Sequence, residues 1–135
     1  MADTQEKDIT KQALVYIDRE PYTTIIETGN HQITADEPLD KGGKDKGPDP
    51  FSMLLSSLGS CVVITLRMYA DRKEMDVERI AADVTMDSDQ NIHVAIEVDG
   101  DISEKQRDRL KQIADMCPVN KFLKKEAVIE KEMVA

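Results

Sequence analysis

Three short apolar runs near the N-terminus alternate with turn residues and predict three antiparallel strands. The first two runs are Ala13 to Ile17 and Tyr22 to Ile26, and Pro21 with its charged neighbours marks the turn between them. Gly29-Asn30 is a favourable hairpin turn, and it precedes a third short run from Gln32 to Ala35. The pattern is typical of a β-meander.

A long apolar helix is predicted after the segment 38–50, "PLDKGGKDKGPDP", which reads as a loop because it is rich in Pro and Gly. The loop lacks the GxxxxGK[ST] spacing of a phosphate loop, so we do not expect it to bind nucleotides. Asp49 is suited to the N-cap and Pro50 to the first helical turn. We expect the helix to run from Pro50 to about Lys73. One stripe shares a helical face: Leu54, Leu58, Cys61, Thr65 and Met68.

Further apolar residues around this helix leave little of its circumference polar, which is typical of a helix buried on several sides. Small residues just before Cys61, at Ser56, Ser57, Gly59 and Ser60, would let another backbone approach closely. Two interpretations stay open for this second surface. It packs either against a partner subunit or against the sheet of its own chain.

The second half of the chain predicts a hairpin, two helices and a last strand. Residues 77–87 and 91–100 alternate apolar and polar positions, with His93 on the polar face as a solvated side chain. Ser103 and Gln106 form a capping-box pattern that opens a helix. Pro118 restarts a helix, and residues 127–135, "AVIEKEMVA", read as a final strand. The order β-β-β-α-β-β-α-α-β predicts an α+β fold, which we expect to form one domain over residues 1–135.

Charge and composition narrow the function classes. The formal net charge of −9 argues against nucleic acid as a partner, because phosphate binding needs clustered Lys and Arg. The polar, acidic N-terminus does not resemble a signal peptide, and no apolar run approaches the roughly 20 residues of a membrane span. We therefore expect a cytoplasmic protein without membrane contact. With no CxxC pair and two separated histidines, we expect no metal and no cofactor.

The two cysteines differ in their predicted surroundings. Cys61 lies in the apolar helix, where it reads as an ordinary core residue whose pKa is raised by burial. Cys117 precedes Pro118 and would be a helix N-cap, where free N–H groups and the helix dipole favour the thiolate. Local sequence thus predicts Cys117 as the more reactive thiol. The spacing of 56 residues between them does not say whether they meet.

Two cysteine motifs resemble one known family. "GPDPFSMLLSSLGSC" with "TLRMYADRK", and "IADMCPVNKFL", are similar to the OsmC-like family, which includes organic hydroperoxide resistance proteins. The similarity begins at about Ile33, and "ADEP" followed by Gly42-Gly43 also resembles the family's loop. The resemblance implies an intertwined homodimer with a long central helix and a thiol peroxidase that uses no cofactor. Cys61 would attack the organic hydroperoxide, Cys117 would resolve the sulfenic acid into a disulfide, and an external dithiol would reduce it.

The resemblance also implies an arginine beside the attacking thiol, and Arg19 stands at a compatible position. The family's peroxidases carry Asn-Pro-Glu, in which the Glu orients this Arg, whereas this chain has Asp49-Pro50-Phe51. The departure favours a less characterised OsmC-like branch. A peroxidase of organic hydroperoxides is therefore the leading hypothesis. The alternatives are a non-enzymatic protein that binds a small apolar or thiol-containing ligand in the dimer cleft, and an interaction or stress protein with purely structural cysteines.

Overall fold

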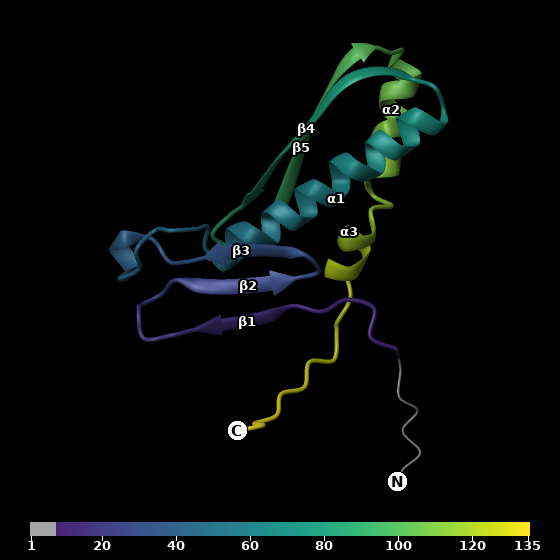
Figure 1. Ribbon diagram of the computed structural model, residues 1–135. Helices are drawn as coiled ribbons and strands as arrows, with labels where there is room; N and C mark the ends of the chain where they lie inside the picture. The colour runs from purple at the N-terminus through teal and green to yellow at the C-terminus, as the bar shows by residue number, and fades with distance from the viewer. Residues whose placement is uncertain (1–7) are drawn as a thin grey trace. The chain divides into compact units, whose positions relative to one another are not determined.

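The first three strands form the predicted meander (Figure 1). The computed structural model describes residues 8–135. In it β1 (Leu14–Ile17), β2 (Thr24–Thr28) and β3 (His31–Ala35) pair antiparallel in the order β1-β2-β3. Gly29 turns the β2–β3 hairpin with φ of +58°, in the left-handed region that glycine adopts without a side-chain clash. The meander is confirmed, although β2 begins two residues later than the sequence suggested.

A loop follows the meander, as predicted, and only one short turn of 3-10 helix, Leu39–Lys41, interrupts it. Helix α1 (Pro50–Arg72) then begins where the sequence placed it. The Asp49 carboxylate caps it, because the Ser52 N–H donates to Asp49 Oδ2 at 3.2 Å. The Asp49 and Pro50 predictions are therefore both confirmed.

The buried face of α1 is rotated from the predicted stripe. Of the predicted positions, Leu58 is in the core, but Leu54 and Met68 are exposed, Met68 by 61%. The predicted positions still share one helical face, but several faces of α1 are apolar, and the neighbouring elements decide which one this chain covers. In the described chain the buried residues are Leu58, Val62, Leu66, Tyr69 and Ala70.

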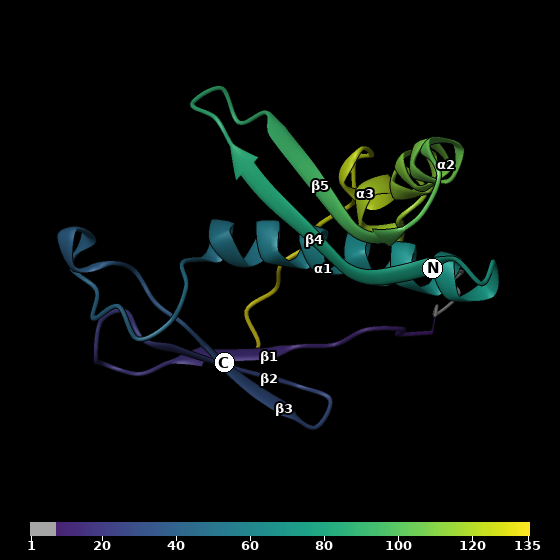
Figure 2. The same ribbon diagram turned by 90° about the horizontal axis from the view of Figure 1, so that it is seen from above.

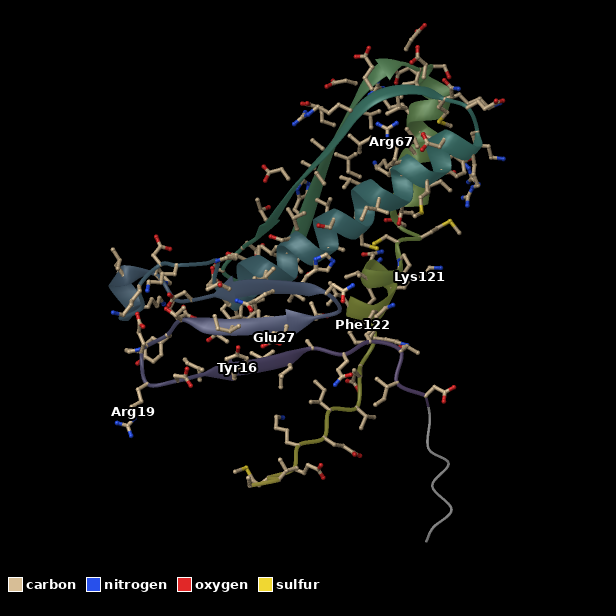
Figure 3. The ribbon with its side chains drawn as sticks, viewed as in Figure 1. Tyr16, Arg19, Glu27, Arg67, Lys121 and Phe122 are labelled. Atoms are coloured by element: carbon tan, nitrogen blue, oxygen red, sulfur yellow. The ribbon has the colours of Figure 1, made fainter. Side chains whose placement is uncertain are left out.

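Two long strands lie along this face of α1 (Figure 2). Strands β4 (Asp76–Met86) and β5 (Ile92–Asp101) form the predicted antiparallel hairpin, with a bulge between Val77 and Arg79. Arg67 on α1 points toward β4 (Figure 3), and it donates to the carbonyl oxygens of Val77 at 2.9 Å and of Glu78 at 3.2 Å. The guanidinium thus ties α1 to the bulged end of the strand.

Two helices complete this layer. Helix α2 (Glu104–Ala114) opens with the predicted capping box, in which the Gln106 N–H donates to Ser103 Oγ and the Gln106 side chain accepts from the Ser103 N–H. Helix α3 (Pro118–Leu123) has Cys117 at its N-cap, as predicted. Leu110 and Ile113 of α2 join the core that α1, β4 and β5 form.

The last predicted strand is wrong. Residues 126–135 have no regular secondary structure, and no strand of the described chain pairs with them. Their apolar side chains are exposed, Val128 by 88% and Met133 by 92%. Val and Ile favour a strand, but a strand forms only where a neighbour accepts and donates its backbone hydrogen bonds.

The chain divides into two compact units, Met1–Met53 and Leu54–Ala135, and the boundary falls inside α1. The first unit holds the meander and the loop, and the second holds most of α1 with β4, β5, α2 and α3. The single domain over residues 1–135 stays a prediction.

The expectation that no apolar run approaches the length of a membrane span is wrong for helix α1. By length and composition it is long and apolar enough to cross a membrane, with a mean hydropathy of 1.6. This is a weak indication, because the core helix of a soluble protein passes the same test. Leu66 and Ala70 in this helix are fully buried against the rest of the second unit.

Candidate active site

Helix α1 presents Cys61 at the edge of the core of the second unit. The residue is half-buried and packs against the buried cluster that includes Val62 and Leu58. One helical turn later on the same face, Thr65 Oγ1 lies 4.0 Å from Cys61 Sγ, which is the limit of a weak sulfur hydrogen bond. The regular helix therefore fixes both the position of the thiol and its nearest hydroxyl.

The junction between α2 and α3 presents Cys117. Its side chain is completely buried, and the Asn120 N–H donates to Cys117 Sγ at 3.5 Å. Pro118 at the first position of α3 has no N–H to satisfy, and the thiol caps the N–H of Asn120, the third residue of the helix. The Asn120 side chain donates to the Asp115 carbonyl oxygen at 3.0 Å and closes the junction.

The two thiols meet, although 56 residues separate them in sequence. Both are free cysteines, and they lie close enough for each to shift the pKa of the other. The Val119 N–H acts on both thiols and lowers the pKa of each. We use the term thiol site for these two sulfur atoms together with Thr65 and the N–H groups of Val119 and Asn120.

The pKa values of the two thiols move in opposite directions. Burial raises the pKa of Cys61, but hydrogen bonds from Cys117, the Val119 N–H and Thr65 outweigh it, so the pKa is lowered overall. Burial raises the pKa of Cys117, and its hydrogen bond to Cys61 raises it further, against the opposing Asn120 N–H. Cys61 is therefore the thiol that ionises first, with the Cys117 S–H as a donor to it.

This order reverses what local sequence predicted for both thiols. Cys117 does cap α3, as expected, but complete burial and the neighbouring sulfur outweigh the N–H group that favours its thiolate. Cys61 was expected to be an ordinary core thiol with a raised pKa, and its contacts lower the pKa instead.

The sequence motifs around these thiols carry a family signature. The model of the OsmC-like protein family matches residues 43–132, about two thirds of the chain. The chain belongs to the OsmC-like family. The match includes both cysteines and all of α1. No curated protein matches the chain at a significant level.

Solved structures agree with this OsmC-like fold. A protein from Psychrobacter arcticus 273-4, named for osmotic stress induction and a detoxification response, is 25% identical with a TM-score of 0.71, over 87% of this chain and 90% of that one. An OsmC-like protein from Mycoplasma pneumoniae is 21% identical with a TM-score of 0.72, over 87% and 89%. A Vibrio cholerae protein assigned to organic hydroperoxide resistance, with captopril in one of its active sites, is 14% identical with a TM-score of 0.58, over 88% of each chain. The α+β fold with antiparallel sheets and a long helix, and the resemblance to this family, are thus confirmed.

The remaining residues predicted for the OsmC-like site lie in the first unit or at its edge. Arg19 is exposed in the connection between β1 and β2, and its side chain points away from the meander (Figure 3). Phe51, at the position of the family's Glu, is 53% exposed in the first turn of α1. Arg19 belongs to the first unit and Cys61 to the second. The role of Arg19 beside Cys61 stays a prediction.

A cavity of about 450 Å³ lies within the second unit. Aliphatic side chains of α1, β5 and α2 form most of its wall, and neither cysteine lines it. Asn120 lines the cavity and also donates its N–H to Cys117 Sγ, so one residue separates the cavity from the thiol site. Its lining residues are Leu58, Val62, Val94, Ile96, Val98, Arg107, Asp108, Leu110, Lys111, Ala114, Asp115 and Asn120.

Sequence reasoning missed Asp36, the one buried charged residue of the described chain. It lies in "ADEP", directly after β3, where the family resemblance had drawn attention only to Pro and the glycines. An acidic residue next to a loop with three glycines is the signal that could have indicated it. Glycine lets a loop backbone approach a carboxylate closely enough for its N–H groups to donate.

Proposed function

We propose that this OsmC-like protein is a thiol-dependent peroxidase that reduces organic hydroperoxides. The single observation that supports it is the neighbouring pair of free thiols, each of which shifts the pKa of the other, with the pKa of Cys61 lowered and that of Cys117 raised. A lowered pKa supplies thiolate, which is the nucleophile, and a raised pKa keeps its neighbour protonated as a donor. Cys61 is the proposed attacking residue, Cys117 the resolving residue, and Arg19 a guanidinium that stabilises the thiolate.

The first proposed step oxidises Cys61. Its thiolate attacks the terminal oxygen of the hydroperoxide, so an S–O bond forms and the O–O bond breaks. The leaving alkoxide takes a proton from water and departs as an alcohol. The sulfur of Cys61 has then lost two electrons and is a sulfenic acid.

The next steps restore the thiols. Cys117 attacks the sulfur of Cys61, so an S–S bond forms, the S–O bond breaks, and hydroxide leaves with the Cys117 proton as water. The existing contact between the two side chains favours this step because a disulfide needs the sulfurs to approach to about 2 Å. An external dithiol then reduces the disulfide by exchange and is itself oxidised to a disulfide.

The proposed assembly is a homodimer in the cytoplasm, without nucleic acid, membrane, metal or cofactor. Apolar side chains that the described chain leaves exposed support the second copy. They lie on β1 and on the uncovered side of α1: Leu14, Val15, Ile17, Ile64 and Met68. Burial of such side chains is the main favourable term in most subunit association.

The test measures hydroperoxide consumption with a dithiol as the reductant. We expect Cys61→Ser to abolish turnover of cumene hydroperoxide. Cys117→Ser should allow one oxidation of Cys61, visible as a sulfenic acid that dimedone traps. Met116→Leu, at an exposed sulfur next to Cys117, is the matched control and should keep full activity. Survival of both free thiols under excess hydroperoxide would overturn the proposal.

A second candidate is a non-enzymatic protein that binds a small apolar or thiol-containing ligand in the dimer cleft. Two observations favour it: Phe51 replaces the carboxylate expected beside Arg19, and an apolar cavity adjoins Asn120 in the second unit. The captopril held by the Vibrio cholerae relative is itself a thiol. Native mass spectrometry that finds a retained ligand, together with no hydroperoxide turnover, would favour binding over catalysis.

A further inference from the structure

Asp36 is a buried carboxylate that the thiol chemistry does not use. It is 2% exposed, and it accepts hydrogen bonds from groups on both sides of it in sequence. From the connection between β1 and β2 come the Tyr22 N–H at 3.3 Å and Thr23 Oγ1 at 2.8 Å. The other donors are the N–H groups of Glu37 at 2.7 Å, Lys44 at 3.3 Å and Lys46 at 3.2 Å. The carboxylate therefore joins two separate segments of the first unit.

Two glycines let the loop close around this carboxylate. We call residues 36–48 the Asp36 loop. A Cβ added at Gly43 would lie 2.0 Å from the Glu37 carbonyl oxygen and 2.9 Å from Asp36 Oδ1. A Cβ at Gly47 would lie 2.2 Å from the Thr34 carbonyl oxygen. The close approach is thus built into the sequence of the loop.

A second connection joins the same two segments at the surface. The Glu20 carboxylate pairs with Lys44 Nζ at 3.3 Å and with Lys46 Nζ at 3.2 Å. These are the same two lysines whose backbone N–H groups donate to Asp36. The pairs are half-exposed, so they add less than the buried hydrogen bonds do.

Both connections hold the bend that carries Arg19. Glu20 is its next neighbour, Tyr22 and Thr23 follow, and on the other side Ile17 pairs with Thr24 in the meander. Among the described residues no hydrogen bond or ion pair involves the Arg19 side chain, which points away from the meander (Figure 3). The backbone at Arg19 is therefore held on both sides while its guanidinium is available to another group.

We propose that Asp36, assisted by Glu20, is a positioning residue that aims Arg19 at the Cys61 thiolate. The inference rests on the role of Arg19 in the proposed function. Phe51 offers no carboxylate that could orient the guanidinium by an ion pair, and in this proposal the hydrogen-bonded backbone of the bend orients it instead. Asp36 itself touches no reacting atom.

The experiment titrates the Cys61 thiolate by its ultraviolet absorbance in the reduced full-length protein, and it measures the rate of Cys61 oxidation by cumene hydroperoxide. Arg19→Met should raise the pKa of Cys61 and slow oxidation by about tenfold or more, because it removes the opposite charge. Asp36→Asn should shift both readouts in the same direction. Asp40→Asn, at an exposed carboxylate of the same loop, is the matched control and should change neither.

Thr23 provides a milder variant in case Asp36→Asn does not fold. Thr23→Val removes the 2.8 Å donor to Asp36 and should slow oxidation by a few fold, whereas Thr23→Ser keeps the hydroxyl and should restore the wild-type rate. In an Arg19→Met background, Asp36→Asn and Thr23→Val should have no further effect on the pKa of Cys61.

Three outcomes would overturn the inference. Asp36→Asn and Thr23→Val could lower stability yet leave the Cys61 titration unchanged, which would make Asp36 purely structural. Their effects could persist in the Arg19→Met background, which would mean that they act by another route. Arg19→Met could itself leave the titration unchanged. A wild-type protein that does not consume hydroperoxide would instead overturn the peroxidase proposal, and the titration would still test the positioning of Arg19.

Discussion

Asp36 in the first unit and Cys117 in the second are both buried, with 2% and 0% of their surface exposed. Burial disfavours the charged form of each, yet hydrogen bonds lower the pKa of Asp36 to about 2 while the pKa of Cys117 is raised. The difference lies in the donors. Four N–H groups and a hydroxyl point at Asp36, whereas at Cys117 the N–H groups of Asn120 and Val119 are outweighed by burial and by a sulfur that competes for the same charge.

The comparison separates a buried group that is held in one protonation state from a buried thiol whose neighbour shifts its ionisation. Every hydrogen bond to Asp36 favours its charged form. The carboxylate therefore has no proton to exchange near neutral pH. The thiol site is less completely satisfied, and each of its two sulfur atoms shifts the pKa of the other. A group that changes its charge during a reaction needs surroundings that do not fix a single protonation state.

The largest effect is expected on the free energy of unfolding, when a side chain is added at Gly47 in the Asp36 loop. Gly47→Ala places a Cβ 2.2 Å from the Thr34 carbonyl oxygen, so β3 or the Asp36 loop must move. We expect the free energy of unfolding to fall by about 3 kcal/mol or more. Gly29→Ala is the control, because nothing lies within 4 Å and only its φ of +58° opposes a side chain. It should cost about 1–2 kcal/mol. Equal losses in urea unfolding would contradict the crowding around Asp36.

The next largest effect is expected on the oxidation rate of Cys61, when the S–H group of Cys117 is removed. Cys117→Ala deletes the S–H that stabilises the Cys61 thiolate, so the pKa of Cys61 should rise and its first oxidation at neutral pH should slow by about tenfold. Cys117→Ser keeps an O–H donor and should slow it less. Stopped-flow measurement of one turnover isolates this step, since neither variant can form the disulfide. Equal rates in the two variants would show that the donor does not matter.

The pH dependence of stability should distinguish Asp36 from other carboxylates. Its folded pKa of about 2 lies below the ordinary value of about 4, so the unfolded chain binds the proton more readily. The stabilisation is complete above about pH 4 and is lost as the pH falls toward 2. Urea unfolding of wild type and Asp36→Asn should therefore differ at pH 5 and converge near pH 2. A constant difference across this range would mean that the charge of Asp36 does not contribute.

Local signals in the sequence were sufficient for most of the fold. The Asp49 cap, the capping box of Ser103 and Gln106, and the turn at Gly29 each depend on residues a few positions apart. The final strand could not be predicted correctly in the same way. Residues 127–135 have two short apolar runs with β-prone residues, but pairing depends on a neighbour that local sequence does not identify.

The thiol site could be predicted only in part. The N-cap position of Cys117 followed from Pro118, whereas the order of the two pKa values depends on a contact between residues 56 positions apart. The resemblance to the OsmC-like family indicated Cys61 as the attacking thiol. Reasoning from burial and the helix cap had instead predicted Cys117 as the more reactive thiol. Asp36 was missed because its five donors come from two segments, and the glycines of the loop indicate a close approach of the backbone without identifying the donors that converge.

The smallest predicted effect concerns Thr65, whose hydroxyl is the weakest donor to Cys61. Its oxygen lies 4.0 Å from the sulfur, so Thr65→Val removes a long hydrogen bond while keeping the shape of the side chain. Stability should change little, and the first oxidation of Cys61 should slow by about twofold at neutral pH. Thr65→Ser keeps the hydroxyl and should match the wild-type rate. A loss as large as that of Cys117→Ala would place the main support of the thiolate on α1 instead of at the junction of α2 and α3.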